Sequence, residues 1–116
     1  MSTFEASISN YRGTPVLKLA GEARLSIETL EEASLHLKAE RPVLLVVDVS
    51  GLSYMSSLTM GALVKLHRAI NSQGGKVKFA GAQPRIQEVL QYARLDTLFE
   101  LCASVDDALG TRGEAT

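Results

Sequence analysis

The sequence predicts a single α/β domain in which about four helices cover a mixed, mostly parallel sheet of five strands. Two observations lead to this fold class. Val43–Val49 is an apolar, valine-rich run with almost no polar alternation, as in a central strand that is covered on both faces. Strand-like and helix-like periodicities alternate after an N-terminal hairpin, in the order β-β-α-β-α-β-α-β-α, and 116 residues suffice for one domain.

The chain begins with the pattern of a β-hairpin. Phe4, Ala6 and Ile8 alternate with polar neighbours, which favours a strand that has one exposed face. Residues 10–13 form a turn, and residues 15–20 form a second strand that tolerates proline only at its start. We expect the two strands to pair in antiparallel fashion.

A first helix follows a loop that is predicted over residues 20–24, around Gly21. Ser26 is a candidate N-cap, and Pro42 closes the segment. One helical face extends to about Ala39 and consists of Ile27, Leu30, Ala33 and Leu37.

Two adjacent serines lie between the valine-rich strand and a second helix. A polar connection is predicted from Asp48 to Ser53, with Gly51 in a left-handed turn. The helix after Ser57 is marked by apolar residues at helical spacing, namely Leu58, Ala62, Leu66 and Ala69, with Leu63 and Ile70 beside them.

The rest of the chain completes the alternation. A turn over residues 71–75 precedes a strand that contains Val77 and Phe79. Pro84 opens a third helix, residues 99–103 form a fifth strand, and Ser104 caps a last helix. The inner faces of the two helices are Ile86, Val89 and Leu90, then Val105 and Leu109. The predicted core spans about residues 4–109, and residues 110–116 are predicted to be a frayed tail.

Composition excludes several classes of function. The net charge is −1 and aromatic residues make up 5% of the chain, so nothing indicates a nucleic-acid surface. No stretch reaches the roughly 18 apolar residues of a membrane span, and the N-terminus has no signal-peptide pattern. We therefore expect a cytoplasmic protein with no nucleic-acid partner and no membrane insertion.

The residue types used in catalysis and metal binding do not converge. His36 and His67 fall in helical segments, and we expect the first to face solvent and the second to lie at the rim of its helix. Cys102 has no metal-ligand companions and reads as a small core residue. The pair Asp106–Asp107 suits a helix start, and Gly74–Gly75 precedes a strand and not a helix. The sequence therefore predicts no enzyme, no metal site and no cofactor.

The serine pair is the best candidate for a functional site. The first amides of a helix lack intrahelical partners, and the helix dipole favours negative charge there. Ser56 or Ser57 can serve as an N-cap, and a phosphoserine at this position is electrostatically tolerated. Capping alone and capping with modification both remain open at this point.

An ordered set of residues around this junction resembles the STAS domain of bacterial anti-sigma factor antagonists. The matching residues are Leu52, Ser53, Tyr54, Met55, Ser57, Gly61, Gly74 and Gly75. The resemblance extends from about Phe4 to Leu109. Ser56 stands where the family has an aspartate, and Leu58–Thr59 stands where it has Ser/Thr-Gly.

This resemblance implies an anti-anti-sigma switch. It implies that Ser57 is phosphorylated by an anti-sigma factor that is also a serine kinase, with Ser56 and Thr59 as weaker acceptors, and that a metal-dependent serine phosphatase reverses the reaction. It also implies a loop contact through Gly21 and Glu22, where Arg24 replaces the acid of the family. The partner-binding residues are then Gly21, Glu22, Met55, Ser56, Ser57, Leu58, Met60, Gly61 and Val64. Met60, Val64 and His67 are expected to be exposed if Leu63 and Leu66 face inward.

Three alternatives remain at this stage. The chain can be a non-phosphorylated scaffold subunit of an ATPase or signalling complex. It can also be a ligand-binding STAS module, although the sequence shows no distinguishing pocket residues. An enzyme is the least favoured alternative.

Overall fold

The computed structural model describes residues 4–23 and 28–110, and within them the element order agrees with the order predicted from the sequence. The elements are β1 (Phe4–Tyr11), β2 (Thr14–Ala23), α1 (Glu28–Glu40), β3 (Leu44–Met55), α2 (Ser57–Ser72), β4 (Lys76–Ala80), α3 (Pro84–Tyr92), η1 (Leu95–Thr97, a 3₁₀ turn), β5 (Glu100–Cys102) and α4 (Val105–Leu109). The sequence analysis missed only η1. No helix in this part of the chain is long and apolar enough to cross a membrane.

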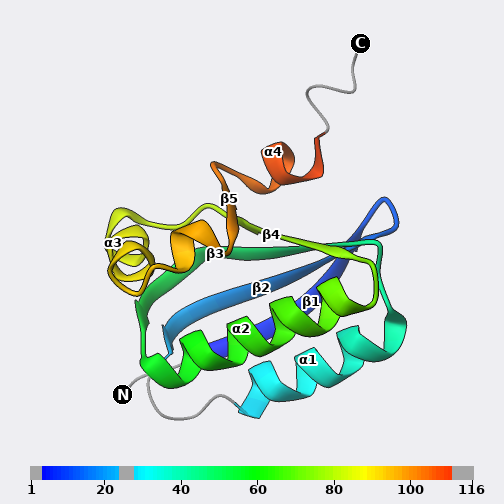
Figure 1. The fold of residues 1–116 in the computed structure, drawn as a ribbon, viewed down its shortest axis with the longest axis horizontal. Coiled ribbons are helices and arrows are strands. Elements are labelled where there is room, and N and C mark those ends of the chain that lie inside the picture. Colours follow the sequence, from blue (N-terminus) through cyan, green and yellow to red (C-terminus); the bar gives the residue numbers. More distant parts are fainter. Residues whose placement is uncertain (1–3, 24–27, 111–116) are drawn as a thin grey trace.

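The strands form one mixed sheet in the spatial order β1-β2-β3-β4-β5 (Figure 1). β1 and β2 pair antiparallel as predicted, and the Asn10 side chain accepts a 2.8 Å hydrogen bond from the Gly13 amide in their turn. The other neighbouring strands pair in parallel. The carboxyl ends of β2, β3 and β4 therefore lie at the same edge of the sheet.

Helices cover both faces of the sheet, and this explains the valine-rich run. Leu45 and Val47 belong to the main core, which includes buried residues of α1, α2 and α3. Val46 points to the other face and packs with Ala80 and Ala108, under α4. All three β3 residues are fully buried, so the prediction of a central strand is confirmed.

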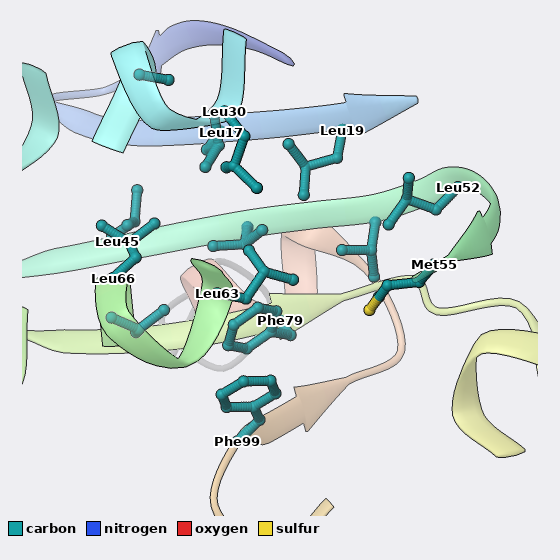
Figure 2. Packing of buried hydrophobic residues seen from close by; sticks show 14 of the residues in the cluster. Leu17, Leu19, Leu30, Leu45, Leu52, Met55, Leu63, Leu66, Phe79 and Phe99 are labelled. Carbon is teal, nitrogen blue, oxygen red and sulfur yellow. The ribbon is translucent and has the colours of Figure 1, made fainter. Parts of the chain in front are cut away.

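Figure 2 shows the main core around β3, where leucines of β2, α1 and α2 meet the side chains of β3. The Phe79 and Phe99 rings stack with their centroids 4.1 Å apart and close one end of this core. The inner face of α3 is formed by Ile86 and Leu90, while Val89 is only half-buried.

The connection predicted from Asp48 to Ser53 is wrong, because these residues continue β3. Glycine and serine made the segment read as a loop, but its backbone pairs with the second half of β2 across two register shifts. Gly51 does not adopt a left-handed conformation. A Cβ atom there would lie 3.0 Å from the Cβ of Ala20, so glycine permits the close approach of the two strands.

The loop predicted over residues 20–24 is likewise shorter than expected. β2 continues to Ala23, and Gly21 adopts a φ of +95° within the irregular pairing. Arg24, Ser26 and Ile27 lie outside the described residues. At the other end of the chain, the predicted cap of α4 is confirmed, since the Ser104 hydroxyl accepts a 3.1 Å hydrogen bond from the Asp107 amide. Gly110 is the C-cap, and residues 111–116 of the predicted tail lie outside the described part.

Candidate functional site

The two adjacent serines have different structural roles. Ser56 has extended backbone angles and is the N-cap of α2, because its hydroxyl accepts a 3.3 Å hydrogen bond from the Thr59 amide. Ser57 is the first residue of the helix and its side chain is exposed. The Ser57 hydroxyl makes no hydrogen bond with any residue of the described ranges. The junction therefore leaves one hydroxyl available at the positive end of the α2 dipole.

The weaker acceptor candidate Thr59 is not accessible to an enzyme. Its side chain is fully buried, and its hydroxyl lies 3.3 Å from that of Ser56. Ser56 is half-buried and has the capping role described above. Of the three candidate hydroxyl residues, only Ser57 is exposed.

Ser57 lies at a groove between α1 and α2, the two helices that run side by side in Figure 1. The hollow has a volume of about 490 Å³. The lining residues from α1 are Glu31, Ser34, Leu35 and Lys38. Those from α2 are Ser57, Leu58, Gly61, Ala62, Lys65 and Leu66. We call this feature the α1–α2 groove. Its apolar rim is prominent, because Leu35 is 66% exposed and Leu58 is 49% exposed.

The exposed strip expected on α2 is wrong, because Met60 and Val64 are half-buried and His67 is buried. Leu58 and Gly61 are exposed and line the groove, but Met60 and Val64 are half-buried and pack against the main core. Met60 also lines a second hollow of about 310 Å³ with residues of α3. Met55 is buried at 4% exposure at the end of β3, so its side chain is not part of a docking surface.

The structure brings Gly21 and Glu22 to the same edge as the serine pair. Gly21 pairs with Leu52 and Glu22 pairs with Tyr54, a few residues before α2 begins. The Ser53 hydroxyl donates a 3.3 Å hydrogen bond to the Gly21 carbonyl oxygen. The segments that the sequence resemblance linked are thus adjacent in space, as the carboxyl ends of neighbouring parallel strands are.

Known protein families and solved structures match this chain in sequence and in fold. A model of the STAS domain matches residues 10–108. The chain belongs to the STAS domain family. The anti-sigma-F factor antagonist RsfB of Mycobacterium tuberculosis is 31% identical over 112 residues, which cover 92% of this chain and 88% of RsfB.

Solved structures share the STAS fold at lower identity. An anti-sigma factor antagonist from Mycobacterium paratuberculosis has a TM-score of 0.85 at 23% identity, covering 94% of this chain and 93% of that one. The anti-sigma factor antagonist SpoIIAA in its unphosphorylated form has a TM-score of 0.73 at 21% identity, covering 96% and 97% of the two chains. SpoIIAA of Bacillus in its phosphorylated form has a TM-score of 0.61 at 19% identity, covering 94% and 98%.

Removing the N-cap of α2 is expected to destabilise this STAS domain. Ser56→Ala leaves the Thr59 amide without its side-chain acceptor, so the free energy of unfolding should fall by about 1 kcal/mol. Urea unfolding followed by circular dichroism measures this loss. Ser57→Ala is the matched control and should change stability little. An equal loss in both variants would contradict the assignment of the cap.

The sequence analysis expected His67 at the rim of α2, but the structure shows it buried in the STAS domain. Its side chain is 7% exposed, and its ring lies 5.4 Å from the Phe99 ring between centroids. The Asn71 side-chain nitrogen lies 3.3 Å from Nε2. Burial, together with the nearby positive charge of Arg68, lowers the pKa of His67 below its ordinary value of 6.5. His67 therefore stays neutral to a lower pH when the domain is folded.

This lowered pKa predicts a loss of stability in acid. The contribution is fully present above the unfolded-state pKa of 6.5, and it falls as the pH drops from there through the folded-state pKa, because only the unfolded chain binds the proton in that interval. Chemical unfolding at a series of pH values between about 7 and 5 measures the slope. The slope should be smaller in His67→Gln than in the wild type. Equal slopes in the wild type and His67→Gln would contradict the prediction.

The remaining polar candidates do not converge on a reaction site. His36 is exposed, as expected, and its Nε2 lies 3.2 Å from a Glu40 oxygen. Cys102 is half-buried and packs against the apolar residues that lie under α4, among them Val46 and Ala80. Burial and the Glu100 carboxylate raise the pKa of its thiol. Within residues 4–23 and 28–110, no three His, Cys, Asp or Glu residues are grouped so that they could hold a metal ion.

The sequence analysis missed the α1 side of the groove. The sequence did indicate an exposed apolar residue on α1. Leu35 lies outside the helical spacing of Leu30, Ala33 and Leu37, and it therefore faces away from the core. The charges of Glu31, Lys38 and Lys65 gave no such signal, since charged residues are common on any exposed helix face.

Proposed function

We propose that this STAS domain is an anti-sigma factor antagonist that binds a serine-kinase anti-sigma factor and is switched by reversible phosphorylation of Ser57. The observation that carries the proposal is the exposed Ser57 hydroxyl at the start of α2, next to a serine that already caps the helix. RsfB is named as an anti-sigma-F factor antagonist, and SpoIIAA occurs in unphosphorylated and phosphorylated forms. These relatives support the proposal.

The physical basis of the switch is electrostatic. A phosphate on Ser57 adds about 1.5 to 2 negative charges next to the exposed Leu58, at the mouth of the α1–α2 groove. Burying that charge against a partner without a matching cation is unfavourable, so binding weakens. The positive end of the α2 dipole tolerates the phosphate, and the first turn of α2 contains no acidic residue. The modified domain therefore stays folded, and a serine phosphatase can restore the first state.

The partner surface that we propose has its centre at Ser57. Leu58 and Gly61 contribute from α2, and Gly21 and Glu22 contribute from the end of β2. Met60 and Val64 contribute only through the parts of their side chains that remain accessible. Because the proposed kinase consumes ATP, this exchange belongs in the cytoplasm.

The direct test is phosphorylation by a kinase-type anti-sigma factor encoded in the same genome. The purified domain, the kinase and ATP are incubated, and intact mass and peptide mapping identify the modified residue. We expect one phosphate, on Ser57, and none on Ser57→Ala. Ser72→Ala, an exposed serine at the other end of α2, is the control and should be modified like the wild type. A Ser57→Ala protein that is modified as fast as the wild type would refute the proposed acceptor.

The scaffold alternative predicts a different result. Stable co-purification with an ATPase complex, with equal recovery of the wild type and Ser57→Asp, would favour a scaffold subunit over a switch.

A further inference from the structure

We infer that the α1–α2 groove receives an apolar anchor side chain of the anti-sigma factor, so that α1 as well as α2 forms the partner-binding surface. The inference rests on the proposed function and extends it to Leu35, Lys38 and Lys65, which neither the sequence resemblance nor the comparisons assign. Its first basis is continuity, because Ser57 and Leu58 belong both to the proposed surface and to the wall of the groove.

The apolar character of the groove indicates a docking site. Leu35 on α1 and Leu58 on α2 are among the large hydrophobic residues that remain exposed, and both line the same hollow. Leu66, at the base, is 2% exposed. Exposed leucines around a hollow of about 490 Å³ form the kind of pocket that anchor residues of protein partners fill. The wide exposure of Leu35 favours a protein over an enclosed small molecule, since small-ligand pockets bury most of the ligand surface.

Gly61 supplies an independent observation. A glycine within a helix lowers helix stability relative to alanine, so it calls for a steric reason. No such reason exists inside the described molecule, because a Cβ atom at Gly61 would meet no atom within 4 Å. Gly61 lines the groove, so the missing side chain enlarges the hollow. The space is therefore useful to an external occupant and not to the fold.

The polar groups of the groove specify the occupant further. Ser34 lines the hollow, and its buried Oγ has no hydrogen-bond partner among the described residues. Lys38 and Lys65 line the hollow as well, and neither forms an ion pair with residues 4–23 or 28–110. Glu31 is the one acidic residue of the lining, so positive charge is in excess there. An amphipathic helix of the anti-sigma factor fits this surface if it presents an apolar side chain to Leu35 and Leu58 and an acidic side chain to the two lysines.

The test measures binding of the same anti-sigma factor by isothermal titration calorimetry. Leu35→Ala removes one wall, Gly61→Gln fills the hollow, and each should weaken binding about fivefold. Lys65→Glu should weaken binding and reduce its dependence on salt. Val43→Ala and Ala39→Gln are the matched controls, because Val43 is 83% exposed, Ala39 is an exposed α1 residue, and neither lines the groove. The thermal midpoint of Gly61→Gln should not fall, so weaker binding would not reflect unfolding.

The possible outcomes separate the inference from the proposed function. Wild-type affinity in Leu35→Ala and Gly61→Gln, with weak binding of Ser57→Asp, would overturn the inference and leave the proposed function standing. No binding by the wild-type domain would overturn both. A dimer in analytical ultracentrifugation that Leu35→Ala dissociates would assign the groove to a second copy. Saturable binding of laurate at the groove, seen as NMR shift changes of Leu35 and Leu58, would assign it to a small amphiphile. Either result would refute the anti-sigma factor as occupant, whereas loss of binding in both groove variants with unchanged controls would support it.

Discussion

Ser57→Asp should weaken binding of the anti-sigma factor at least tenfold, or about 1.4 kcal/mol, while the domain stays folded. The aspartate places a negative charge where the partner would cover the start of α2, and removing that charge from water on binding is unfavourable. The fold is unaffected because Ser57 is exposed, and an acid in the first helical turn is stabilised by the helix dipole. Calorimetric titration measures the affinity, and circular dichroism checks the fold.

Ser57→Asn is the matched control for this prediction. Asparagine has nearly the size and shape of aspartate but no charge, so it should bind the anti-sigma factor much more tightly than Ser57→Asp. If both variants weaken binding equally, size and not charge is responsible. If neither weakens it, Ser57 lies outside the interface.

Gly75→Ala should lower the free energy of unfolding by about 3 kcal/mol, the largest stability effect that we expect of a single added methyl group. A Cβ atom at Gly75 would clash with the Pro42 carbonyl oxygen and would lie 2.9 Å from Cγ2 of Ile70. The backbone has little freedom to move away. The Gly75 amide donates a 3.0 Å hydrogen bond to the Ile70 carbonyl oxygen, and the next amide bonds to Val43.

Gly61→Ala is the control, and the opposite sign is expected for it. This glycine is helical and has open space where a Cβ would lie, so alanine should raise the free energy of unfolding by up to about 1 kcal/mol. Urea unfolding of the two variants and the wild type provides the comparison. A neutral Gly75→Ala would show that the contact with Pro42 relaxes at little cost.

The sequence predicted the fold well where the pattern was local and repeated. The continuous apolar run around Val46 indicated a strand buried on both faces, and Pro84 and Ser104 marked helix starts. Asp48–Ser53 was misread because strand formation there depends on pairing with β2 across two register shifts, and such pairing is not visible in a single segment. Glycine at position 51 suggested a turn, whereas the structure uses its small size.

The candidate site could be predicted only in part. The sequence placed two serines at the start of a helix, but it did not show at which of them the helix begins. Only the backbone geometry shows that α2 begins at Ser57 and that Ser56 is the N-cap. His67 was misplaced because its burial depends on Phe99, which lies far away in the sequence. The α1–α2 groove depends on how two helices pack, and therefore no single stretch of sequence could reveal it.

The separate roles of the two serines have a consequence for the stability of the domain before and after phosphorylation. The hydroxyl that holds the first turn of α2 together belongs to Ser56, whereas the one exposed to solvent belongs to Ser57. Chemical change at Ser57 therefore leaves the bond between Ser56 and the Thr59 amide intact. If Ser57 is phosphorylated as proposed, both forms of the domain should therefore have a similar free energy of unfolding.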